Sequence, residues 1–152
     1  MKQIHVECLP DECLVKKLGF SRKQITHHQG KSRVFHALNN KTDKQLGVVD
    51  EDPGSAKTSY ESALQLVEES EGIKYYTDRS GNKIFVLKGK LEDWIIFICN
   101  KSKIKPTDFG LPSKPDDLHD VINQRLANFE KLIDELISIN NPAIIKLKSW
   151  LS

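Results

Sequence analysis

The strongest constraint on this fold is an apolar run, residues 46–53, that ends in three consecutive acids and a proline. Val48 and Val49 favour an extended backbone, and Pro53 lacks the N–H that a further ladder hydrogen bond would need. The run therefore predicts a buried strand that stops at the acidic residues and delivers them to an edge of a sheet.

Alternation along that strand divides its acids between two sides. Asp50 and Asp52 should lie on one side of the chain and Glu51 on the other, because side chains alternate with a period of two. Two carboxylates on one side repel each other unless a cation or a proton lies between them. Oxygen ligands of this kind suit Mg²⁺ or Mn²⁺. A plain acidic turn after a core strand is the simpler alternative.

The segments around this strand alternate between strand and helix patterns. Pro10 closes the first apolar segment, and Gly19 and Gly30 punctuate the next two. This order predicts an α/β fold with a mainly parallel central sheet and flanking helices. The first expected strand runs from 4 to 7 or 8, and the next two are 24–28 and 45–50. The expected helices are 12–18, with Asp11 as its N-cap, and 31–38.

A parallel sheet brings the ends of its strands to one edge, where α/β proteins bind their ligands. Glu7 follows the first strand, so it should meet Asp50 and Asp52 within reach of one or two cations. The second strand leads into His28 and Lys31, which would bring basic groups to the same edge. If the basic side chains of the first third gather there, the surface would suit a phosphate polymer held over a metal.

The second half of the chain continues the mixed pattern. Turn residues at 78–82 separate two apolar segments and predict a hairpin. Beyond residue 102 the pattern is helical, so we divide the single domain into an α/β core at 1–102 and a C-terminal helical extension at 103–152 packed on it. The expected elements are a helix at 59–69, strands at 73–77 and 83–87, a helix at 91–99, a connection at 103–115, one long amphipathic helix from 116 to the Asn-Asn-Pro at 140–142, and a helix at 142–151.

Glu92 and Asp93 begin the helix expected at 91–99. Carboxylates in the first turn interact favourably with the positive end of a helix, and we favour this role for both. The alternative is that one of them adds a metal ligand or a general base to the acidic edge.

Composition excludes several classes of protein. The 152 residues are 38% hydrophobic and 29% charged with a net charge of +2, as in a soluble globular domain. The longest apolar run, 94–99, is too short to span a bilayer, and the first residues lack the apolar core of a signal peptide, so we expect a cytoplasmic protein. Cys8, Cys13 and Cys99 form no C-x-x-C pair, and no P-loop or dinucleotide fingerprint occurs.

Two acidic motifs resemble the pattern of the TOPRIM family. That pattern places a glutamate after the first strand and an Asp-x-Asp after a later parallel strand. In this chain the motifs read Val6-Glu7-Cys8-x-x-Asp11 and Val49-Asp50-x-Asp52.

A third segment, Leu91-Glu92-Asp93-Trp94, is similar to the downstream acidic segment of small TOPRIM-like proteins related to overcoming-lysogenization-defect (OLD) nucleases. The resemblance covers residues 4–99 and leaves the C-terminal helices unassigned. One departure is Cys8, which stands where the family usually has glycine.

The resemblance implies a Rossmann-like TOPRIM fold and a Mg²⁺- or Mn²⁺-dependent nuclease. Glu7 would be a ligand or a general acid–base, and Lys31 would stabilise developing phosphate charge. The implied metal ligands are Glu7, Asp50 and Asp52, joined by Asp11, Glu92 or Asp93, and the implied nucleic-acid contacts are Lys31, Arg33 and His28.

Two other functions fit the same sequence. One is a non-catalytic subunit that keeps the TOPRIM scaffold and binds a protein partner such as an ATPase in trans; a homo-oligomer is compatible with each of these functions. The other is a metal-dependent hydrolase of small phosphate compounds.

Overall fold

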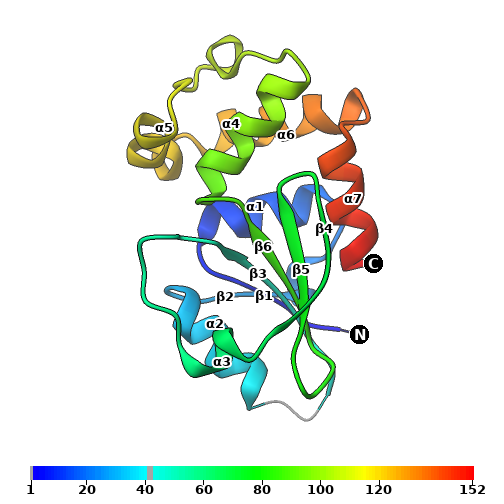
Figure 1. Ribbon diagram of the computed structural model, residues 1–152. Coiled ribbons are helices and arrows are strands. Elements are labelled where there is room, and N and C mark those ends of the chain that lie inside the picture. The colour runs from blue at the N-terminus through cyan, green and yellow to red at the C-terminus, as the bar shows by residue number, and fades with distance from the viewer. Residues whose placement is uncertain (1, 41–42) are drawn as a thin grey trace.

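A six-stranded sheet forms the centre of the molecule, with the strand order β2-β1-β3-β6-β5-β4 (Figure 1). The computed structural model describes residues 2–40 and 43–152. Strands β1, β2, β3 and β6 run parallel, whereas β5 and β4 are antiparallel to their neighbours. The strands are β1 (Ile4–Val6), β2 (Ile25–His27), β3 (Leu46–Asp50), β4 (Gln65–Ser70), β5 (Ile73–Thr77) and β6 (Lys83–Leu87).

Helices cover both faces of the sheet and give three layers (Figure 1). The larger layer holds α1 (Leu9–Lys17), α4 (Leu91–Lys101), α5 (Pro115–Val121), α6 (Leu126–Ser138) and α7 (Pro142–Leu151). The opposite face carries α2 (Lys31–Asn39) and the short α3 (Ser59–Ser62). The predicted α/β class, with a mostly parallel sheet and flanking helices, is therefore confirmed.

Successive residues of β3 point to opposite faces of the sheet and pack into the two hydrophobic cores. Val48 is fully buried in the larger core, and Val49 packs with α2 in the smaller one. The parallel register pairs Val6 with Val48 and Asp50 with Leu87, so β1, β3 and β6 end at the same edge. This register places the residues that follow each strand side by side.

The C-terminal helices share the larger core with the sheet. Phe129, Leu132 and Leu147 are fully buried in the same cluster as Phe85 of β6. The ring of Trp150 in α7 stacks on Phe85 with a centroid separation of 5.7 Å. Within the described residues, no helix is both long and apolar enough to cross a membrane.

The helix predicted at 59–69 is wrong. Only residues 59–62 are α-helical, and residues 65–70 form the edge strand β4. Glu71 and Gly72 connect β4 to β5 with positive φ values of 55° and 73°. A two-residue turn with both φ values positive matches the twist of a hairpin, so this local turn outweighs the helical spacing of Ala63, Leu64 and Val67.

The single long helix predicted from 116 to 139 is also wrong. The chain leaves α5 at Val121, makes a 3-10 turn (Ile122–Gln124), and starts α6 after Arg125. Arg125 has a non-helical φ of −129° and ψ of 38°, and its Nη1 donates to the carbonyl of Gly110 at 3.1 Å. This tertiary contact fixes the bend that lets both helices face the larger core.

Helix α1 starts earlier than predicted, and Asp11 is not its N-cap. The helix begins at Leu9 after Cys8, with Pro10 in the first turn, where proline is favoured because it needs no N–H partner there. Asp11 therefore lies inside the first turn and is 1% exposed. The earlier start of the helix turns this carboxylate into the protein.

Candidate functional site

Four carboxylates gather at the edge where the parallel strands end, and we call them the acidic cluster: Glu7, Asp11, Asp50 and Glu92. They come from four segments: the loop after β1, the first turn of α1, the end of β3 and the first turn of α4. Asp11 and Glu92 are buried, with 1% and 5% exposure. Acids are rarely buried to this extent unless a partner compensates them.

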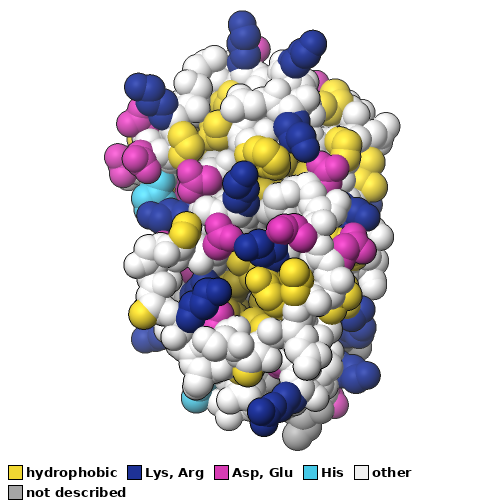
Figure 2. Space-filling model, in the orientation of Figure 1, with side chains coloured by type: hydrophobic (Ala, Val, Ile, Leu, Met, Phe, Trp, Pro, Cys, Tyr) yellow, Lys and Arg dark blue, Asp and Glu magenta, His cyan; other side chains and the backbone are white. Residues whose placement is uncertain are grey.

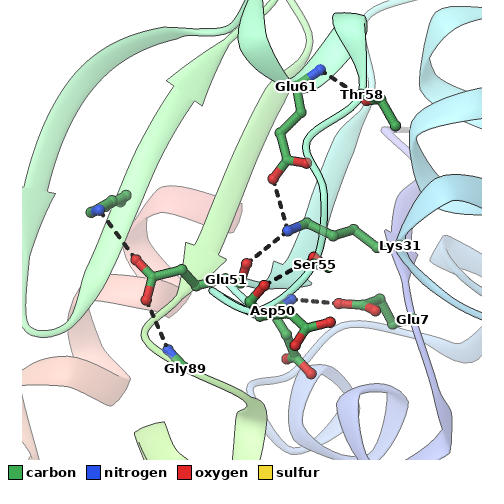
Figure 3. A network of polar contacts seen from close by, with 10 residues as sticks. Glu7, Lys31, Asp50, Glu51, Ser55, Thr58, Glu61 and Gly89 are labelled. Atoms are coloured by element: carbon green, nitrogen blue, oxygen red, sulfur yellow. Dashed lines mark hydrogen bonds and ion pairs between the residues drawn. The ribbon is translucent and has the colours of Figure 1, made fainter.

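A direct hydrogen bond joins the first and third segments of the cluster. The backbone N–H of Asp50 donates to Oε2 of Glu7 (Figure 3). The bond follows from the parallel register, which brings the end of β3 beside the residue after β1. The structure thus brings Glu7 and Asp50 together at the edge that the sequence indicates.

Two oxygens of the acidic cluster are buried without a hydrogen-bond partner among the described residues, Oδ1 of Asp11 and Oδ1 of Asp50. The other oxygen of Asp11, Oδ2, accepts a hydrogen bond from Cys8 Sγ at 3.1 Å. A buried acceptor without a partner costs about 1–3 kcal/mol, and more when it is charged. A cation or a proton at these two oxygens would remove that cost.

Burial and mutual repulsion raise the pKa values in the cluster. Burial is the largest cause for Asp50, followed by the charges of Asp11, Glu7 and Glu92, and its pKa rises to about 9. Burial, opposed by the Cys8 hydrogen bond and reinforced by the charges of Glu7 and Glu92, raises the pKa of Asp11 to about 7. Burial also raises the pKa of Glu7. Without a cation, the cluster retains protons at neutral pH.

The donors suit a hard divalent cation, since all are carboxylate oxygens and two of them have no other partner within residues 2–40 and 43–152. Within residues 2–40 and 43–152, no three His, Cys, Asp or Glu side chains are arranged around a common point. Binding an ion would therefore require the carboxylates to turn toward one another from these positions.

Asp52 lies at the rim of the cluster and not inside it. Its φ of 44° is in the left-handed region, which Asp tolerates better than most residues, and its N–H donates to the carbonyl of Gly89 at 2.8 Å. Its charge contributes to the raised pKa of Glu7. Glu51 points away from Glu7, and its carboxylate accepts hydrogen bonds from Lys74 Nζ at 3.2 Å and from Gly89 N–H at 3.3 Å (Figure 3).

Lys31 lies beside the cluster and is held by two contacts (Figure 3). Its Nζ forms an ion pair with Glu61 Oε2 at 2.8 Å and donates to the carbonyl oxygen of Glu51 at 2.9 Å. Its positive charge opposes the rise in the pKa of Glu7. The predicted basic group thus reaches this edge of the sheet.

His28 and Arg33 lie elsewhere. Nε2 of His28 is 3.0 Å from Nδ1 of His5, and both rings line a separate polar cavity of about 460 Å³. Arg33 is exposed on α2, where its charge contributes to the lowered pKa of His28, after burial and the neighbouring histidines. His27, the neighbour of His28, instead contacts Glu12, because adjacent residues of a strand point to opposite faces.

The structure separates the two acids at the start of α4. Oδ2 of Asp93 accepts a hydrogen bond from the backbone N–H of Lys90 at 2.8 Å, so Asp93 caps the helix. Glu92 turns into the acidic cluster, where Oε1 lies 3.1 Å from Nδ1 of His119 in α5. Sequence reasoning missed His119, because only the packing of α5 against α4 brings it to the site.

No protein-family model matches the chain, and comparisons with curated proteins and with solved structures give no match either.

Proposed function

We propose that this protein is a Mg²⁺- or Mn²⁺-dependent nuclease of the TOPRIM type, which cleaves phosphodiester bonds in nucleic acid. The observation that carries the proposal is that two buried atoms in a cluster of four acids, Oδ1 of Asp11 and Oδ1 of Asp50, have no hydrogen-bond partner in the part of the chain that the structure describes. Structural acids in a protein core normally have hydrogen-bond partners, so partnerless oxygens favour a ligand that completes them.

The cation would be held by the acidic cluster together with Asp52 at its rim. Bound there, it would supply Lewis-acid stabilisation of the phosphoryl oxygens and an activated water. The raised pKa values of Asp50 and Asp11 imply that these groups release protons when the ion binds.

Two further side chains, Lys31 and Glu7, would stabilise phosphate charge and transfer a proton. Lys31 holds a positive charge next to Glu7, where it would stabilise the charge that develops on a phosphate. Burial raises the pKa of Glu7, which makes this carboxylate a stronger base than an exposed glutamate and suits it to accept a proton. The loop after β3 carries Asp52 at the rim of the candidate metal site. The same loop carries the carbonyl oxygen of Glu51 that holds Lys31, so it connects the metal site to this lysine.

The double substitution Asp50→Asn and Asp52→Asn tests the proposal. It removes two anionic ligands, so we expect Mn²⁺-dependent cleavage of labelled DNA and RNA oligonucleotides to fall at least about 100-fold. The fold should persist, because the amides are close in size to the acids, and a thermal melting curve checks this.

Glu51→Gln is the matched control. Glu51 lies between the two aspartates but points away, and the amide oxygen of Gln can still accept from Lys74 and Gly89. We expect cleavage by this variant close to that of the unmodified protein. Undiminished cleavage by the double variant, or no cleavage of any oligonucleotide by the unmodified protein, would contradict the proposal and favour a protein-binding subunit on the same scaffold.

A further inference from the structure

Among the described residues, the one hydrogen bond of the Glu92 side chain is made with the C-terminal extension. Nδ1 of His119 lies 3.1 Å from Oε1 of Glu92. An ionised carboxylate can only accept, so in that form of Glu92 the Nδ1–H of the imidazole is the donor. The contact crosses from α5 to α4 and joins residues 27 positions apart in sequence.

The two partners differ in exposure. The side chain of Glu92 is 6% exposed and that of His119 is 56% exposed. The neighbouring Leu118 is fully buried and anchors α5 against the larger core. The backbone around His119 is therefore fixed, while its ring covers the outer oxygen of a buried acid.

We infer that His119 is a positioning residue of the candidate metal site, which holds the Glu92 carboxylate turned toward Asp50 and Asp11. This inference rests on the proposed function. Glu92 is close enough for its charge to act on both aspartates, and each of them carries a partnerless oxygen. Without the imidazole, the Glu92 carboxylate would lose the contact from α5 that fixes its orientation.

Hydrogen bonds from outside the ligand shell fix the orientation of metal ligands, and their loss typically weakens metal binding about 10–100-fold. His119 would act in this way from a helix that does not belong to the α/β core. The C-terminal extension would then contribute to the site itself, beyond covering the sheet.

Calorimetric titration with Mn²⁺ alone, without nucleic acid, tests the inference. We expect His119→Ala to weaken binding about 10-fold or more. His119→Asn should restore most of the affinity, because the Asn amide N–H₂ group can replace the Nδ1 donor. His36→Ala removes an exposed histidine of α2 whose ring, among the described residues, hydrogen-bonds to Asn40, and this variant should bind Mn²⁺ like the unmodified protein.

A double-mutant cycle separates positioning from a general structural effect. In a Glu92→Gln background, His119→Ala should cause little further loss of Mn²⁺ affinity, since the pair acts as a unit. Equal Mn²⁺ affinity of His119→Ala and the unmodified protein would overturn the inference and leave the proposed function intact. A failure of His119→Asn to recover affinity would also overturn it, whereas an unmodified protein that binds no Mn²⁺ would overturn both.

Discussion

The backbone of Asp50 stabilises the fold, whereas its buried carboxylate destabilises it. Its backbone completes the end of β3 and donates to Glu7, which fixes its position among other acids. Its carboxylate is consequently buried with Oδ1 lacking a partner, and its pKa rises to about 9. Ionised Asp50 is therefore costly for the fold, as expected of a residue placed for a ligand more than for stability under the proposed function.

The raised pKa of Asp50 predicts a pH-dependent stability. The folded protein binds this proton more tightly than the unfolded chain, whose Asp titrates near 3.8, so stability should fall as the pH rises from about 4 toward 9. Asp50→Asn should flatten the fall in melting temperature between pH 5 and 9. Part of it should remain, because the pKa of Asp11 is raised in the same direction.

Melting curves of the two proteins across this pH range, without divalent ions, provide the measurement. Parallel pH profiles for Asp50→Asn and the unmodified protein would show that Asp50 does not hold the proton. Addition of Mn²⁺ at pH 8 should raise the melting temperature of the unmodified protein more than that of the variant.

At the scale of single elements, the sequence predicts what is buried better than what is exposed. β3 and α4 are recognisable because Val48, Val49 and Trp94 belong to apolar runs whose ends carry clear turn or capping residues. β4 escapes prediction because Leu66 and Val67 are exposed at 56% and 53%, so neither follows the alternation of a half-buried strand. The decisive signal is the turn after it.

A substitution at Gly72 tests how strongly the turn between β4 and β5 stabilises this hairpin. Its φ is +73°, and an added Cβ would lie 3.0 Å from Phe97 Cε2 and 3.1 Å from Trp94 Cδ1. Gly72→Ala should therefore lower the free energy of unfolding by about 1–2 kcal/mol. Gly54→Ala is the control, since a Cβ there meets nothing within 4 Å. Urea denaturation measures both, and equal midpoints would refute the assigned turn.

At the scale of the whole molecule, some residues of the candidate site can be predicted from the sequence and others cannot. Glu7 and Asp50 are predictable because parallel strands bring their ends together. Asp11 depends on the start of α1, which lies at Leu9 and not at residue 12 as predicted. The start of α4 is predicted correctly, but only the hydrogen bonds of Glu92 and Asp93 separate their roles. The place of His119 depends on the packing of α5 against α4, and no local pattern indicates it.

Removal of residues 103–152 tests the dependence of the core on the extension. The truncated chain would expose the face of the sheet that Phe129, Leu132 and Trp150 now cover, including the fully buried Phe85. We expect it to lose the cooperative thermal transition and to bind a hydrophobic dye. A cooperative transition near the melting temperature of the full chain would show that the α/β part folds alone.

The central position of β3 also has a kinetic consequence. It lies between β1 and β6, and the acids that meet beside its end are separated by up to 85 positions, from Glu7 to Glu92. Contacts of such long range form late, because the chain must first close large loops. During refolding, Mn²⁺ binding should therefore develop with the slowest phase that restores native tryptophan fluorescence, and a folding intermediate should carry no ion.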